Sequence, residues 1–100
     1  MAPTSVLVVD DSALMRRALK GILIEAGGFE VNTARNGIDA LEELARLKPD
    51  VVTLDVNMPE MDGLSCLAHI MERQPTPVVM VSSLTESNAL VTLEAPGLGT

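Results

Sequence analysis

The stretch DVVTLDVNMPEMDG, residues 50–63, decides the fold of this chain. It opens with apolar and β-branched residues at 51–54, which is the composition of a strand buried on both faces of a sheet. The run ends in the carboxylate of Asp55, and a segment with proline and glycine follows. An ionised carboxylate directly after a buried strand lowers stability unless it is paired, hydrogen-bonded or coordinated. The stretch therefore predicts a strand whose C-terminal end carries a functional acid.

Three further apolar runs alternate with segments of helical spacing. They are SVLVVD at 5–10, FEVNTA at 29–34 and PVVMVSS at 77–83. This alternation is the βαβα pattern of a parallel sheet with helices on its faces. The run 29–34 alternates polar and apolar residues, so we expect it at an edge, and the simplest strand order is then 2-1-3-4. The sequence thus predicts an α/β protein with an open parallel sheet.

Helical spacing predicts four helices. The first ends at Gly27-Gly28, and Asn36 with Asp39 resembles a capping box that opens the second. The third begins at Asp62-Gly63, and a fourth is expected from about Thr85 to Ala95. The apolar residues expected on the buried faces are Met15, Ala18, Leu19, Ile22 and Ala26 in the first helix and Leu64, Leu67, Ala68 and Met71 in the third. Cys66 is expected to pack as a small buried hydrophobe.

Length and charge narrow the function classes. The 100 residues are expected to form one domain, residues 1–100, with a formal net charge of −7. Such a field repels phosphate backbones and anionic lipids, so we expect neither nucleic acid nor a membrane as a partner. The N-terminus lacks the features of a signal peptide, and no apolar run is long enough to cross a bilayer. We therefore expect a cytoplasmic protein.

Three acids fall at the C-terminal ends of neighbouring strands. Asp10 and Asp11 close the first strand and Asp55 closes the third, and in the order 2-1-3-4 these strands are adjacent. Ligands bind at this edge of a parallel sheet, where the strand order reverses. Three close carboxylates are tolerated if protons are retained or if a hard cation such as Mg²⁺ is held. The pattern indicates a carboxylate nucleophile beside a metal, with Asp55 as nucleophile and the other two as ligands.

Two further polar residues lie on the same rim, and simpler roles compete with the functional ones. The Ser83 hydroxyl could bond a phosphoryl oxygen, or it could satisfy local backbone groups, as serines at strand ends usually do. Asn57 could offer its backbone carbonyl to the metal. Asp11 or Ser12 could simply cap the first helix.

Four motifs carry a specific family resemblance. They are VLVVDDSALMRR at 6–17, ARNGIDALEEL at 34–44, PDVVTLDVNMPEMDGL at 49–64 and TPVVMVSSLT at 76–85. In this order and spacing they resemble the receiver domain of two-component response regulators. Among these, they look most like the N-terminal regulatory domain of the chemotaxis protein-glutamate methylesterase family. The resemblance covers residues 5 to about 93.

The resemblance implies a role for each site residue. Asp55 matches the phosphoacceptor, which receives a phosphoryl group from a histidine kinase. Asp10 and Asp11 match the acidic pair that binds Mg²⁺, and the backbone carbonyl of Asn57 matches a further protein ligand. Ser83 matches the switch hydroxyl that moves toward the aspartyl-phosphate. The loop with Met58-Pro59 and Gly63 matches the one that shapes the site.

The sequence also departs from the family. Receivers carry a fifth strand that ends in a lysine, followed by a fifth helix, whereas no lysine follows Lys48 here. We therefore expect a flavodoxin-like receiver sheet of order 2-1-3-4, C-terminally truncated before the fifth strand and fifth helix. The fourth strand, around 78–81, would then be an open edge with two apolar faces, and such edges recruit other strands. Self-association through this strand is the expected consequence.

Three functions compete at this point. The leading one is a phosphoacceptor domain that regulates an output methylesterase domain lying outside this chain, so that the chain itself is not an enzyme. The second is a stand-alone receiver that signals by docking a partner protein. The third is a Mg²⁺-dependent phosphatase acting through an aspartyl-phosphate, but such enzymes usually place a second acid two residues after the nucleophile, where this chain has Asn57.

Overall fold

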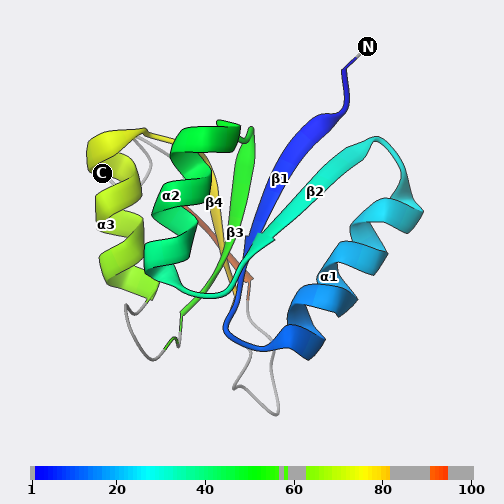
Figure 1. The fold of residues 1–100 in the computed structure, drawn as a ribbon, viewed down its shortest axis with the longest axis horizontal. Coiled ribbons are helices and arrows are strands. Elements are labelled where there is room, and N and C mark those ends of the chain that lie inside the picture. Colours follow the sequence, from blue (N-terminus) through cyan, green and yellow to red (C-terminus); the bar gives the residue numbers. More distant parts are fainter. Residues whose placement is uncertain (1, 57, 59–62, 82–90, 95–100) are drawn as a thin grey trace.

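The computed structural model describes residues 2–56, 58 and 63–81 in full and residues 91–94 by their backbone (Figure 1). The elements along the chain are β1 (Thr4–Val9), α1 (Ala13–Ala26), β2 (Phe29–Ala34), α2 (Gly37–Leu47), β3 (Val51–Asp55), α3 (Gly63–Arg73), β4 (Val78–Val81) and β5 (Val91–Glu94). Among the described residues, no helix is long and apolar enough to cross a membrane.

The strands form one sheet in the order β2-β1-β3-β4-β5. The first four are mutually parallel, which confirms the predicted order 2-1-3-4 and the edge position of β2. Figure 1 shows α2 and α3 on one side of the strands and α1 on the other. Because β1 and β3 are adjacent and parallel, both end at the same edge of the sheet, directly before the segments that carry the acids.

The main core lies between the sheet and the pair α2 and α3. Two rows of strand residues face these helices, Leu7-Val52-Val78 and Val9-Leu54-Met80, and each row is set by the register of the ladder. Ala40, Leu44, Cys66 and Ile70 of the two helices pack against the rows. Burial of this apolar surface is the main stabilising contribution to the fold.

Cys66 occupies the centre of this core. Its side chain is fully buried, and its sulfur lies 4.0 Å from the carbonyl oxygen of Gly37, where α3 meets α2. Burial raises the pKa of the Cys66 thiol to about 11, so the reactive thiolate is scarce near neutral pH. The predicted packing role is confirmed.

The helix ends follow the local sequence. The Ser12 side chain caps α1 by accepting a hydrogen bond from the Met15 amide, and Asn36 caps α2 in the same way through the Asp39 amide. Gly27 ends α1 with a positive φ of 85°, a conformation that suits glycine. The predicted limits of these helices are therefore confirmed.

The predicted buried faces of two helices are partly wrong. In α1 no residue is buried: Met15 and Leu19 are half-buried, whereas Ile22 is 63% exposed. This helix contacts β1 and β2, and nothing else in the described residues covers its other side. In α3 the fully buried residues are Gly63, Cys66 and Ile70. The predicted Leu67 and Met71 are half-buried and pack against the core, whereas the predicted Leu64 and Ala68 are exposed, Leu64 at 65%.

The end of the chain requires a further correction. The predicted helix at 85–95 is wrong for residues 91–94, which form the strand β5, paired antiparallel to β4 over its whole length. Residues 85–90 and 95 lie outside the described residues. The β-branched residues in VTLE favour a strand, and the unpaired backbone groups of β4 offer it a partner. Because β5 covers the outer side of β4, the predicted open edge is wrong and self-association through β4 loses its basis.

Candidate functional site

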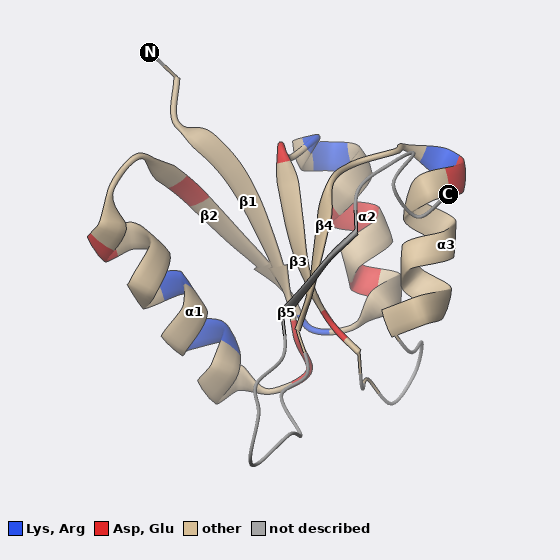
Figure 2. Ribbon diagram, turned by 180° about the vertical axis from the view of Figure 1, so that it is seen from behind, with Lys and Arg blue, Asp and Glu red and all other residues tan. Residues whose placement is uncertain are grey.

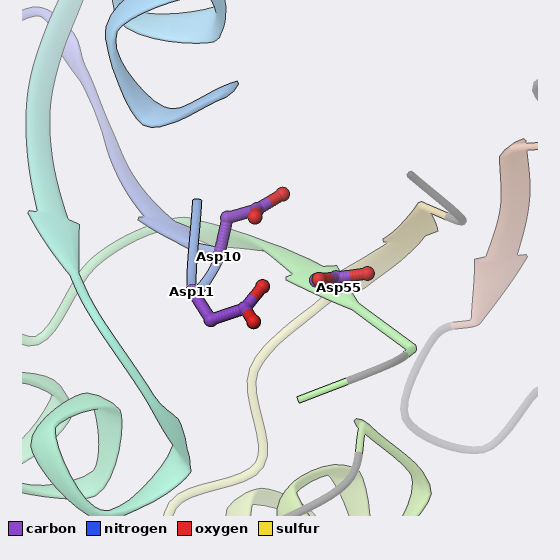
Figure 3. A group of neighbouring side chains, drawn as sticks. All are labelled: Asp10, Asp11 and Asp55. Atoms are coloured by element: carbon purple, nitrogen blue, oxygen red, sulfur yellow. The ribbon is translucent and has the colours of Figure 1, made fainter. Parts of the chain in front are cut away.

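Three carboxylates meet at the edge of the sheet where β1 and β3 end. Val9 pairs with Leu54 in the ladder, so Asp10 and Asp55 follow at the same level, and Asp11 comes next along the chain. One carboxylate oxygen from each acid lies within 4.8 Å of the others. Figure 3 shows their carboxyl groups gathered at this edge, and Figure 2 shows acidic segments at the ends of β1 and β3. The structure thus brings together the three acids that the sequence singled out.

The three acids differ in exposure. Asp10 and Asp55 are each 1% exposed, whereas Asp11 is exposed. The cluster therefore has a buried floor and one side open to solvent. Since Ser12 caps α1, the alternative that Asp11 serves only as the cap is not supported.

Asp10 is fixed by hydrogen bonds on its amide, its carbonyl and one carboxylate oxygen. Its amide donates to the carbonyl of Ala34 over 3.1 Å, and its Oδ1 accepts from the amide of Ser12 over 2.9 Å. Its carbonyl accepts from Nη1 of Arg16 over 2.8 Å. The corner between β1 and α1 therefore holds the Asp10 carboxyl in one place.

Asp55 is positioned by the strands and by the start of α3. The strand β3 pairs with β4 up to Asp55 itself, and the next amide, that of Val56, donates to the carbonyl of Val81 over 3.0 Å. The amide of Gly63 donates to the carbonyl of Val56 over 2.9 Å. A Cβ atom at residue 63 would lie only 2.5 Å from the carbonyl oxygen of Asp55, so glycine alone permits this approach.

The cluster disfavours its own negative charge. Burial raises the pKa of Asp10 above its ordinary value of 3.8, the amide of Ser12 opposes this, and the neighbouring charges of Asp55 and Asp11 raise the pKa further. The cationic Arg16 also lowers it. A divalent cation would relieve the same repulsion, and carboxylate oxygens are the ligands that Mg²⁺ prefers. The donor set therefore fits Mg²⁺.

Other predicted site residues lie outside the described residues. These are Asn57, Pro59, Asp62 and Ser83, so the roles expected for them stay predictions. Of the predicted loop, Met58 is buried at 7% exposure and joins the core, and Gly63 begins α3.

Sequence reasoning missed Arg16, which supports the site. One signal pointed to it. Negative side chains favour the N-terminal turn of a helix, yet α1 has no acid there and carries Arg16 and Arg17 soon after its cap. A basic residue at the N-terminal end of a helix is unfavourable unless a nearby acceptor stabilises it, and the Asp10 carbonyl is that acceptor.

Fold and site together define a class. Four parallel strands carry three acids at the switch point of the sheet, and the chain matches the response regulator receiver domain family over residues 6–98. The chain therefore belongs to this family.

Individual relatives narrow the class. The chain is 69% identical to the protein-glutamate methylesterase/protein-glutamine glutaminase 3 of Rhodospirillum rubrum over 96 residues. These residues are 96% of this chain and 26% of that protein. The response regulator domain of Thermotoga maritima CheB superposes with a TM-score of 0.78 at 48% identity, over 87% of this chain and 66% of that one. The predicted resemblance to methylesterase regulatory domains is confirmed. The chain spans about a quarter of the length of the curated relatives it matches.

A third relative is solved with partners. One chain of the crystal structure of the CheX-CheY-BeF3-Mg²⁺ complex from Borrelia burgdorferi superposes with a TM-score of 0.76 at 38% identity, over 85% of this chain and 66% of that one. The shared fold therefore extends to chemotaxis receivers other than those of the methylesterases.

The raised pKa of Asp10 predicts that removal of its charge increases the free energy of unfolding, by an amount that depends on pH. The folded chain holds the Asp10 proton more tightly than the unfolded chain, so this group stabilises the fold below 3.8 and loses that contribution as the pH rises through its folded pKa. Asp10→Asn should therefore raise the free energy of unfolding near neutral pH without Mg²⁺, and the gain should shrink as the pH falls toward 3.8. Urea unfolding across this range measures it, with the exposed Asp50→Asn as control. A gain independent of pH would contradict the account.

The close approach at Gly63 predicts an asymmetry between two glycines. Gly63→Ala places a methyl group against the backbone of Asp55 and Val56, and overpacking of this kind costs about 1–3 kcal/mol of unfolding free energy. Gly21 lies in α1 with open space around it, so Gly21→Ala should instead stabilise by roughly 0.5–1 kcal/mol. Denaturant unfolding of both variants measures the difference. Equal effects of the two would show that residue 63 has room for a side chain.

Proposed function

We propose that this chain is a phosphoacceptor domain that takes a phosphoryl group on Asp55 with Mg²⁺ held at Asp10, Asp11 and Asp55. The observation that carries the proposal is the convergence of the three carboxylates within 4.8 Å at the end of β1 and β3. Membership of the receiver family supports the same chemistry. The backbone carbonyl of Asn57 is proposed as a further ligand and the Ser83 hydroxyl as the switch group.

Asp55 is the better nucleophile of the two buried acids. Oδ1 of Asp10 already accepts the Ser12 amide, and its carboxyl follows β1 in a corner held by Arg16. Asp55 ends β3 beside the exposed Asp11, so a donor can approach from the solvent side. An oxygen of Asp55 attacks the phosphorus of a phosphohistidine, the new O–P bond forms, and the P–N bond breaks. The electron pair of the broken P–N bond stays on the imidazole nitrogen of the kinase histidine.

The chain's own residues would orient the reacting groups. Asp10 and Asp55 are almost fully buried, so their charges are little screened, and Mg²⁺ bound there would neutralise the charge on the transferred phosphoryl oxygens. The ladder between β3 and β4 and the contact with Gly63 hold Asp55 in place. This fixed position supports the proposal, because phosphoryl-transfer sites act mainly by positioning and electrostatic stabilisation.

The output is proposed to lie outside these residues. The curated relatives are protein-glutamate methylesterases about four times as long as this chain, and residues 1–100 are proposed as one receiver domain of such a protein. We infer that phosphorylation of Asp55 regulates a methylesterase domain in a cytoplasmic chemotaxis protein, with a histidine kinase as the donor. The second candidate, a receiver that acts by docking another protein, is favoured by the Borrelia complex, which contains CheX, BeF3 and Mg²⁺.

Phosphorylation of one residue can be tested by intact mass. Incubated with Mg²⁺ and acetyl phosphate, the parent chain should gain one phosphoryl group, and Asp55→Asn should gain none because it lacks the nucleophile. Asp50→Asn is the matched control, since Asp50 stands at the opposite end of the same strand and is exposed. It should be labelled like the parent, and chelation of Mg²⁺ should prevent labelling. Labelling of Asp55→Asn, or none of a folded parent, would overturn the proposal.

A further inference from the structure

One basic side chain is built into the corner between β1 and α1. Arg16 lies on α1 one turn after the cap residue Ser12, and its Nη1 donates to the main-chain carbonyl of Asp10 over 2.8 Å in a partly buried bond. The bond links the end of the strand to the start of the helix, six residues apart. Figure 2 shows basic segments of α1 close to the acidic end of β1.

The Arg16 bond completes a closed set of hydrogen bonds. The amide of Ser12 donates to Oδ1 of Asp10, and the Ser12 hydroxyl accepts from the amide of Met15. The amide of Arg16 donates to the carbonyl of Ser12. Asp10 is thus held by its carboxyl through Ser12 and by its carbonyl through Arg16. Without Arg16, the peptide that joins Asp10 to Asp11 loses the hydrogen bond that this side chain donates to it.

We propose that Arg16 is a positioning residue, which fixes the Asp10–Asp11 peptide so that both carboxylates face the metal site. The effect on metal binding rests on the proposed function, whereas the fixing of the peptide does not. Arginine suits this role because its planar guanidinium stays charged and forms strong, directional bonds. Residues that orient ligands in this way typically change metal affinity by about 10–100-fold when they are removed.

The charge of Arg16 predicts the opposite effect, so the sign of the change separates the two roles. A cation beside three carboxylates repels a second cation, and its removal alone would tighten Mg²⁺ binding. Loss of positioning would weaken Mg²⁺ binding. Arg17 is the matched control because it is the next residue, carries the same charge and is exposed.

Calorimetric titration with MgCl2 tests the metal-binding part. Arg16→Ala should weaken Mg²⁺ binding about 10-fold, whereas Arg17→Ala should leave it within about twofold. Arg16→Lys keeps the charge and one donor but lacks the rigid fork, so it should recover part of the loss. Tighter or unchanged binding in Arg16→Ala, or an equal loss in Arg17→Ala, would overturn the proposal. If Arg16→Ala does not fold, Arg16→Lys must still bind Mg²⁺ less tightly than the parent.

Amide hydrogen exchange without Mg²⁺ tests the fixing of the peptide by itself. In Arg16→Ala the Ser12 amide should exchange about 10-fold faster than in the parent. A factor of this size is expected from the loss of one charge-assisted hydrogen bond. Arg17→Ala should match the parent. Equal exchange in all variants would overturn the positioning role. If the parent binds no Mg²⁺ but Arg16→Ala still exchanges faster, the proposed function fails and the positioning of Asp10 stands.

Discussion

The mutual repulsion of three carboxylates is the constraint on which the site depends. Parallel pairing of β1 with β3 brings Asp10 and Asp55 to one edge, and both are buried, where like charges interact strongly. The surrounding structure acts to keep them there: Ser12 and Arg16 hold Asp10, and Gly63 lets α3 approach the backbone of Asp55. The chain thus sustains an arrangement that is unfavourable without a cation, which is typical of a functional site.

The sequence predicted the elements whose signal is local. Continuous β-branched runs predicted three of the four parallel strands, the alternation in 29–34 predicted the fourth as an edge strand, and the acids at strand ends predicted the cluster. These predictions succeeded because strand order in such sheets fixes which ends are neighbours. The position of the acids at the strand ends suggested Asp55 as nucleophile and Asp10 and Asp11 as metal ligands, and the family resemblance implied the same roles.

The predictions from sequence failed where a contact with a distant part of the chain determines the local structure. The buried face of α3 centres on Cys66 and Ile70 because Cys66 fits against Gly37 of α2, while the larger Leu64 stays exposed. Residues 91–94 form a strand because β4 offers an edge with unpaired backbone groups. The spacing of apolar residues in this segment carries no information about that edge. Arg16 was missed for a similar reason, since its partner is a main-chain carbonyl, which every residue has.

The central claim is that Mg²⁺ relieves the repulsion among Asp10, Asp11 and Asp55. Urea unfolding of the parent chain with increasing MgCl2, at constant ionic strength, tests it most directly. The account predicts that the free energy of unfolding rises with the logarithm of Mg²⁺ concentration, reaching about 2.7 kcal/mol at a hundred times Kd, and that Asp11→Asn loses most of this rise. Unfolding that responds to MgCl2 no more than to NaCl would contradict the claim.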